Sequence, residues 1–530
     1  MLLALALLWQ DPLAVRADTV RARHDAVHYD IAAAIGDTGR RFAAEVTTSW
    51  LLTSSAPIVV ALDTPFAVVG VWVGDSGGRQ LHRVAWKRDG GLIVIPHTGG
   101  AGDSAVTRIR YHGTPADGLI IRRAADGTFT AFADNWPDRA HRWFPSQDVP
   151  GDKATASFRI DAPPGYQVVA NGRLVGVDTL KDGGTVWRYQ QDAPVSPYNL
   201  VFGLARFAVA RLGPAGCAVA CVPMSVWTYP ADSAYAVSGP FRRAGEILDF
   251  LQRTIGPFPY AKLAHVESST RFGGMENASS IFYDENAYRS QRVSEETVAH
   301  ESAHQWFGDA VTEADWHHLW LSEGFATYFA ALWVGHADGD SAGRADWARS
   351  AQAVFKSPAT ERPIIDTAAT DLMRLLNTNN YQKGAWVLHS LQRMVGDSAF
   401  FAGIRAYYAR FRDRTALSSD LASVMGQAAG TDLRWYFDQA LLQPGYPKLE
   451  IRSAFDSAAG HLTLTVRQVQ PAGWGTFRLP GLTFVVDGVA SRHDVAGSET
   501  VITLDHVARA PASIAVDPDG DWLLQATVIK

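Results

Sequence analysis

Two histidines and a glutamate in the middle of the chain have the spacing of a metal site. The segment H-E-S-A-H places His300 and His304 four residues apart, with Glu301 directly after the first. Ser294 is a suitable helix N-cap, and residues four apart on a helix project from the same face. Both imidazoles can therefore bind one Zn²⁺ ion, with Glu301 beside the open coordination position as general base. The alternative is a pair of exposed helix histidines.

A third ligand is expected from the residues that follow. After 18 further residues the chain reads Glu323-Gly324-Phe325-Ala326. Ser322 can cap a second helix, which would put Glu323 in its first turn. A carboxylate from a second, packed helix completes a two-histidine, one-glutamate zinc site. His317 and His318 are rival ligands because they are also near in sequence, although we expect them to lie in a packing loop.

Length and composition describe a globular protein with several domains. The chain has 530 residues, of which 47% are hydrophobic and 19% charged, and its net charge is −6. This length predicts about two to four domains. The acidic balance and the lack of a run of lysines and arginines argue against a nucleic-acid partner, because phosphate binding needs a dense basic face. We also expect no transmembrane span.

The texture of the sequence changes twice along the chain. Short alternating stretches broken by glycine-rich turns predict an antiparallel β domain over residues 20–212. Long stretches with helical spacing begin around Ser233 and predict a mainly helical domain over 213–443. Pro444-Gly445-Tyr446-Pro447 then opens a region of alternation over 444–530, which predicts a small β sandwich. The predicted fold class is multidomain α+β.

The N-terminus and the cysteines bear on location. Residues 1–19 contain a short apolar run that resembles the core of a secretion signal, although the usual basic start is missing. A frayed apolar terminus is the alternative. Cys217 and Cys221 suit either a local disulfide of an exported protein or two buried thiols. We expect export to the periplasm or the extracellular space, with the cytoplasm as the alternative.

Two further motifs accompany the histidine pair. Gly273-Gly274-Met275-Glu276-Asn277 lies upstream of it, and Tyr381-Gln382-Lys383-Gly384 lies downstream. In this order, the three motifs resemble the zinc site, the G-x-M-E-N exopeptidase motif and the Y-x-K-G segment of the gluzincin aminopeptidases of family M1. The β–helical–β order fits as well, so the resemblance covers nearly the whole chain and implies a thermolysin-like catalytic domain. The large C-terminal helical domain of many members is not expected, because too few residues follow Pro444.

The resemblance implies a role for each of these residues and an activity for the protein. The zinc ligands would be His300, His304 and Glu323, with one ion per chain. The catalytic residues would be Glu301 as general base and Tyr381 as hydrogen-bond donor to the oxyanion. The substrate-binding residues would be Gly273, Gly274, Met275, Glu276 and Asn277, with Glu276 on the free α-ammonium. The implied activity is hydrolysis of the N-terminal peptide bond of peptides.

One position departs from the family pattern. Where many members have a second acidic or amide residue that holds the α-amine, alignment on the R-W-F-P stretch places Trp136. Either Asp134 or Asn135 is a substitute, or Trp136 itself shapes the pocket, so the mode of amine recognition stays open. Two other functions are therefore retained as alternatives. One is an M1-like peptidase without a strict requirement for a free amine, and the other is an inactive relative that serves as a binding scaffold.

Overall fold

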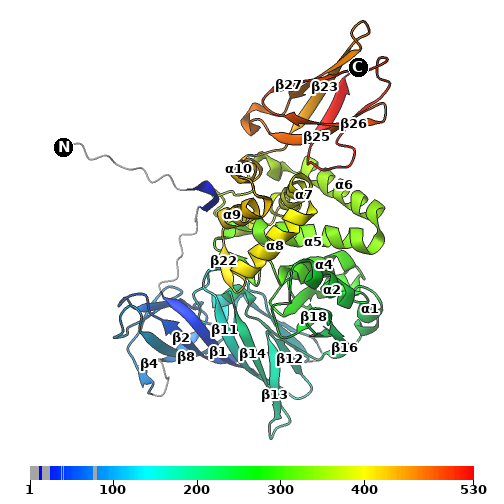
Figure 1. Cartoon of the computed structure of the whole chain (residues 1–530). Helices are drawn as coiled ribbons and strands as arrows, with labels where there is room; N and C mark the ends of the chain where they lie inside the picture. The colour runs from blue at the N-terminus through cyan, green and yellow to red at the C-terminus, as the bar shows by residue number, and fades with distance from the viewer. Residues whose placement is uncertain are drawn as a thin grey trace, which may run out of the picture. The chain divides into compact units, whose positions relative to one another are not determined.

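The computed structural model describes residues 11–14, 24–36, 39, 41–75, 80–125 and 127–529. Apart from residues 11–14, the predicted signal segment lies outside the described residues. The chain divides into two compact units (Figure 1). The described residues of Asp18–Trp316 and Tyr408–Ala416 form the first, called the N-terminal unit. Those of Met1–Ala17, His317–Tyr407 and Leu417–Lys530 form the second, called the C-terminal unit.

The N-terminal unit begins with strands whose side chains alternate between buried and exposed. Its first strands are β1 (Asp25–Ile35), β2 (Phe42–Leu51), β3 (Ile58–Ala61), β4 (Ala67–Asp75), β5 (His82–Arg83), β6 (Lys87–Asp89), β7 (Leu92–Ile95), β8 (Ser104–Gly113), β9 (Leu119–Arg123), β10 (Phe129–Ala133), β11 (Ala154–Ala162), β12 (Gln167–Ala170), β13 (Arg173–Thr179), β14 (Thr185–Val195) and β15 (Phe202–Ala205). They form an eight-stranded sheet in the order β13-β14-β11-β1-β2-β8-β4-β5, a four-stranded sheet β12-β15-β10-β9 and a three-stranded sheet β3-β7-β6. Most neighbours are antiparallel, and β1 with β11 is a parallel pair. The predicted antiparallel β domain is confirmed.

A mixed sheet and four helices complete the N-terminal unit. The strands are β16 (Ala208–Ala215), β17 (Val222–Thr228), β18 (Leu263–Ser268), β19 (Gly274–Met275), β20 (Ser280–Asp284), β21 (Val311–Glu313) and β22 (Arg414–Ala416). The helices are α1 (Ser233–Ser238), α2 (Ala244–Thr254), α3 (Glu285–Arg289) and α4 (Glu295–His304). The order of the five-stranded sheet is β16-β17-β18-β20-β19, which leaves β19 at one edge. The first helix starts at the residue where helical spacing begins in the sequence.

The C-terminal unit combines helices with two small sheets. The helices are α5 (Trp320–Asp338), α6 (Asp340–Lys356), α7 (Gly384–Val395), α8 (Asp397–Phe411), α9 (Ser418–Ala429) and α10 (Arg434–Leu442), and the last four residues of α8 are assigned to the N-terminal unit. The strands are β23 (Lys448–Asp456), β24 (His461–Gln468), β25 (Leu479–Val486), β26 (Val489–Val495), β27 (Glu499–Leu504), β28 (Ile514–Val516) and β29 (Gln525–Ile529). They pair as β27-β24-β23-β29 and β26-β25-β28, as expected for a small sandwich after Pro444.

Short 3₁₀ turns connect several of these elements. The 3₁₀ turns are η1 (Pro12–Ala14), η2 (Ala140–Arg142), η3 (Pro197–Asn199), η4 (Trp316–His318), η5 (Pro358–Glu361), η6 (Leu372–Leu375) and η8 (Ala472–Trp474). Within the part of the chain that the structure describes, no helix combines the length and the apolar character needed to cross a membrane. Cys217 and Cys221 form a disulfide in the loop between β16 and β17.

Candidate functional site

The two motif histidines lie on α4, whose start is capped as the sequence predicts. The Ser294 side chain accepts a hydrogen bond from the Thr297 amide at 3.0 Å. The rings of His300 and His304 project from one face, and their Nε2 atoms are 3.0 Å apart. Two imidazole nitrogens that share one tetrahedral Zn²⁺ at roughly 2.0–2.1 Å would be about 3.3 Å apart. The pair therefore fits a single zinc ion.

His304 is oriented by the backbone just beyond the helix. Its Nδ1 lies 3.1 Å from the Phe307 carbonyl oxygen, which can only accept a hydrogen bond. Nδ1 must therefore carry the proton, which leaves the lone pair on Nε2. A zinc ligand needs this tautomer, and a carbonyl behind the ring is a common way to fix it.

Glu301 lies against Gly274, the first residue of β19. A Cβ atom built on Gly274 would be 2.0 Å from Glu301 Oε1, whereas a Cβ on Gly273 would meet nothing within 4 Å. The Glu301 side chain is also buried, at 6% exposure. A side chain at position 274 would therefore displace the Glu301 carboxylate from its present position. The sequence predicted both glycines as substrate contacts, and the geometry gives Gly274 this additional task.

Glu323 lies in the first turn of α5, as predicted, although the helix starts earlier than expected. The cap position is taken by Leu319 and α5 begins at Trp320, so the prediction of Ser322 as N-cap is wrong. One ligand atom from each of His300, His304 and Glu323 lies within 4.8 Å of the others. Two imidazoles and a carboxylate are a donor set that zinc accepts. The chemistry of this group therefore fits the predicted ion.

The rival histidines have other partners. His317 Nε2 lies 2.9 Å from the Ala369 carbonyl oxygen, and His318 Nδ1 lies 2.8 Å from the Ser418 hydroxyl oxygen. Neither belongs to the group of three potential metal ligands found among the described residues. Both rings are buried, as expected for packing residues.

Tyr381 lies in a π-helical turn, η7 (Asn379–Lys383), which runs directly into α7. Such turns occur frequently at functional sites. A Cβ on Gly324 would lie 2.9 Å from the carbonyl carbon of Gly384, so α5 and α7 meet backbone to backbone. This close approach holds the Y-x-K-G segment beside the first turn of α5, which carries Glu323.

Asp134, a candidate substitute at the amine site, is neutralised by arginines. Its carboxylate is fully buried and pairs with Arg271 at 2.9 Å and with Arg139 at 3.2 Å. It also accepts a hydrogen bond from the Thr270 hydroxyl at 3.1 Å. These contacts tie the N-terminal β domain to the residues just before Gly273, and they occupy the carboxylate that an ammonium group would need.

Asn135 and Trp136 are also committed to internal contacts. The Asn135 amide donates to the Leu200 carbonyl oxygen at 2.8 Å and accepts from the indole N–H of Trp143 at 2.8 Å. Trp136 is 3% exposed, and its ring packs edge-on against Phe272 with centroids 5.9 Å apart. Glu276 is therefore the acidic residue of these motifs that we retain for an α-ammonium group.

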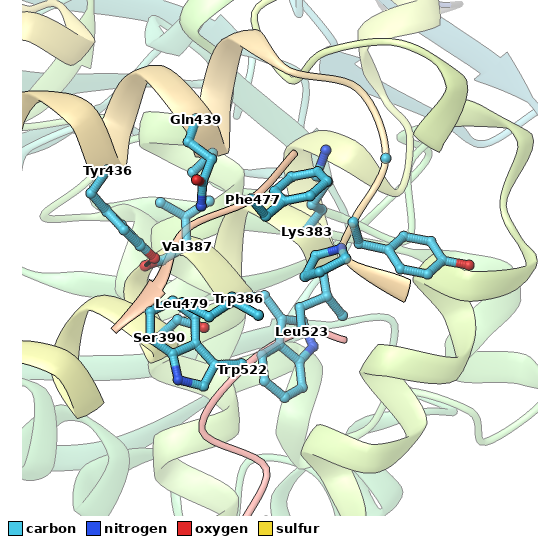
Figure 2. Close-up of a pocket in the computed structure, with 14 residues that line it drawn as sticks. Lys383, Trp386, Val387, Ser390, Tyr436, Gln439, Phe477, Leu479, Trp522 and Leu523 are labelled. Carbon is cyan, nitrogen blue, oxygen red and sulfur yellow. Dashed lines mark hydrogen bonds between the residues drawn. The ribbon is translucent and has the colours of Figure 1, made fainter. Parts of the chain in front are cut away.

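An apolar pocket lies wholly within the C-terminal unit (Figure 2). Lys383, Trp386, Tyr446 and Leu523 are among its lining residues, and its free volume is about 60 Å³. The lining contains no carboxylate and no histidine, and its ionisable groups are the amine of Lys383 and the hydroxyl groups of Tyr436 and Tyr446. We therefore place the candidate active site at the motif residues on α4 and α5.

With this geometry in view, similarity to known proteins decides the family. Residues 26–199 match the peptidase M1 N-terminal domain, and residues 241–439 match the peptidase family M1 domain. The chain belongs to peptidase family M1. The two matches follow each other in the order that the motifs predicted, and the second includes all three of them.

Curated relatives and a solved structure agree with this M1 assignment. The chain is 28% identical over 346 residues to glutamyl aminopeptidase of Sus scrofa, a match that covers 61% of this chain and 35% of the relative. It is 30% identical over 357 residues to aminopeptidase N of Streptomyces lividans, a match that covers 63% of this chain and 40% of the relative. The matched region thus spans well under half the length of these relatives.

The crystal structure of Legionella pneumophila aminopeptidase A in complex with aspartic acid has the same fold. The TM-score is 0.83 at 15% identity, and the match covers 97% of this chain and 61% of that one. At this identity the likeness concerns the fold alone. It supports the predicted multidomain α+β architecture.

Proposed function

We propose that this M1 protein is a zinc-dependent aminopeptidase that hydrolyses the N-terminal peptide bond of peptides. Membership of the family supports a peptidase, and the names of the relatives support aminopeptidase activity. The observation that carries the proposal is the group formed by His300, His304 and Glu323, with Glu301 on the same helix as the two histidines. This arrangement supplies a metal site and a general base together.

The residues of the chain would divide the chemistry among themselves. His300, His304 and Glu323 would hold a Zn²⁺ ion, which would supply a Lewis acid and would lower the pKa of a bound water to about 7. Glu301 accepts a proton from the attacking water and delivers it to the leaving amine. Tyr381 donates a hydrogen bond to the oxyanion of the tetrahedral intermediate, an interaction worth roughly 2.7–4 kcal/mol in comparable sites.

The substrate would bind along β19, the edge strand of its sheet. Such a strand can pair with an extended peptide through its backbone. Glu276 follows this strand directly and is 6% exposed. Its carboxylate would pair with the α-ammonium group of the peptide. An acetylated N-terminus carries no positive charge to attract this carboxylate, which would favour free amino ends.

A panel of aminoacyl fluorogenic substrates tests the activity, and each is compared with its N-acetylated twin. The panel includes glutamyl and aspartyl substrates because of the names of the relatives. We expect hydrolysis of free-amine substrates that a chelator abolishes and added Zn²⁺ restores. Equal cleavage of the acetylated twins would instead favour a peptidase without a strict free-amine requirement. Protein that binds no stoichiometric zinc and cleaves neither set would favour the binding scaffold.

We also propose that the protein is exported. The Cys217–Cys221 disulfide supports this location, because disulfides persist mainly in oxidising compartments. Cell fractionation would test it, and recovery of the protein in the cytoplasm with reduced cysteines would contradict it.

A further inference from the structure

The turn that carries Glu276 is buried and adopts a costly backbone conformation. It comprises residues 276–279, between β19 and β20. Ser279 has φ +64°, a left-handed value that few residues other than glycine adopt without strain. Such a turn keeps its shape only when its surroundings hold it.

Three side chains from the N-terminal unit hold the second half of the turn. Asn199 accepts a hydrogen bond from the Ala278 amide at 3.1 Å, and Asn171 donates one to the Ala278 carbonyl oxygen at 2.6 Å. The Lys262 ammonium group donates to the Ser279 carbonyl oxygen at 3.1 Å. None of these three contacts reaches Glu276 itself.

The first half of the turn is held by Gln305, the residue directly after the metal-site His304. Its Nε2 donates to the Glu276 carbonyl oxygen at 2.5 Å, while its Oε1 accepts from the Ser279 amide at 2.7 Å. One side-chain amide therefore spans the turn from end to end. Gln305 is fully buried, so water does not compete for these bonds.

Asp309 fixes which way this amide faces. Its Oδ2 accepts the second N–H of Gln305 at 2.9 Å. Reversing the amide would place an oxygen against both the Asp309 carboxylate and the Glu276 carbonyl. The observed orientation is therefore the one that satisfies all three partners.

We propose that Gln305 is a positioning residue that sets the place of the Glu276 carboxylate relative to the metal-binding helix. The reason is geometric: Gln305 is the direct covalent neighbour of a metal ligand and also clasps both ends of the turn that carries Glu276. Loss of the clasp would let Glu276 move away from the α-ammonium group of a substrate. This inference rests on the proposed function, because it concerns the α-amine contact of that same site.

The chain offers a matched control in Gln252 on α2. Gln252 is also buried, and its Nε2 donates to the carbonyl oxygens of Gly216 and Ala220 at 3.1 and 3.2 Å. Its Oε1 accepts from the Phe258 amide at 3.1 Å. It thus donates twice to the loop that contains the disulfide and accepts once from the segment after α2, so it is also a buried amide with three backbone partners. A general loss of stability should appear equally in both variants.

The test measures recognition of the amine directly, with zinc-loaded protein. Inhibition constants are compared for the hydroxamate of the amino acid preferred in the substrate panel and for the same hydroxamate without its α-amine. We expect wild-type protein to bind the amine-bearing probe more tightly. In Gln305→Leu this preference should fall about tenfold, as expected for loss of one contact worth about 1.4 kcal/mol. In Gln252→Leu the preference should stay at the wild-type value.

A second variant covers the case in which Gln305→Leu does not fold. Gln305→Glu keeps the shape and the acceptor for Ser279 but loses the donor to Glu276 and Asp309, so it should lower the preference as well. An unchanged preference in a folded Gln305 variant would overturn the inference while the proposed function stands. Wild-type protein that binds both probes equally would overturn the proposed amine contact itself.

Discussion

Two lysines whose ammonium groups lie in the protein interior show how differently the molecule surrounds a buried charge. Lys262 in the N-terminal unit donates to the carbonyl oxygens of Ala170 and Ser279 and to the Ser280 hydroxyl, at 2.9, 3.1 and 2.7 Å. Lys383 in the C-terminal unit faces the apolar pocket, and its hydrogen bond to the Gln443 carbonyl oxygen is long, at 3.4 Å. Burial lowers the pKa of both to about 7.

The different partners of the two lysines distinguish the candidate active site, where polar groups hold the backbone, from the apolar pocket, where side-chain packing dominates. Around Lys262 and the Glu276 turn, side chains hydrogen-bond to the backbone of residues 276–279 at 2.5 to 3.1 Å, so the backbone of the turn is held in advance of any substrate. Such preorganisation is what an active site requires. Around Lys383 aromatic and aliphatic side chains dominate, and the ammonium group has little to compensate for its lost hydration. Substitutions in the first region should therefore change chemistry, and those in the second should change stability.

The largest effect is expected for Glu301→Gln. The amide keeps the shape of the side chain but cannot accept a proton from water, so turnover should fall at least about 10³-fold. Zinc content should stay at one ion per chain, because the three proposed ligands are untouched. Metal analysis and kcat on the best substrate of the panel check both parts. Full activity of this variant would show that another group is the base.

A smaller loss of activity is expected for Gly274→Ala, and the neighbouring glycine provides a control. Gly274→Ala would place a methyl group 2.0 Å from the present position of Glu301 Oε1, so the carboxylate must move. A displacement of about 1 Å of a catalytic group can lower the rate about 100-fold. Gly273→Ala is the control, because its methyl group would meet nothing within 4 Å. If the two variants have equal kcat/KM, close contact with β19 does not position Glu301.

The sequence predicted the fold class because each region has its own periodicity. Alternation over the N-terminal strands and helical spacing from Ser233 onward correspond to elements found there. Local capping chemistry was less informative. Ser294 caps α4 as predicted, but Ser322 lies inside α5, because the 3₁₀ turn η4 leads almost directly into that helix and Leu319 takes the cap position. A serine before a helical pattern does not reveal such a preceding turn.

The site was predictable where side-chain type and spacing carry the chemistry. His300, His304 and Glu323 form the group that their spacing indicated. The supports of that site could not be predicted, because Gln305 and Lys262 bind backbone atoms of a turn whose position only the folded chain defines. The one available signal was that Gln305 directly follows a predicted ligand. The sequence also could not distinguish Gly274 from Gly273, because only the folded structure shows that Gly274 faces the Glu301 side chain and Gly273 does not.

The smallest effect is expected for Lys383 in the apolar pocket, and it concerns the stability of the protein. Lys383→Met replaces a poorly solvated amine with an apolar side chain of similar length in a pocket that has about 60 Å³ of free volume. The pKa of Lys383 is lowered from 10.5 to about 7 in the folded protein. Between these values the unfolded chain binds more protons than the folded one, so this lysine makes stability rise with pH in that window. Below pH 7 its destabilising effect is fully present.

We therefore expect Lys383→Met to raise the unfolding temperature by a few degrees near pH 6.5, and by progressively less towards pH 9.5. Thermal unfolding across this range measures the gap between variant and wild type. Lys262→Met is the matched control and should destabilise, because it leaves the carbonyl oxygens of Ala170 and Ser279 without their ammonium donor. A gap for Lys383→Met that does not change with pH would mean that burial leaves the amine of Lys383 with an ordinary pKa.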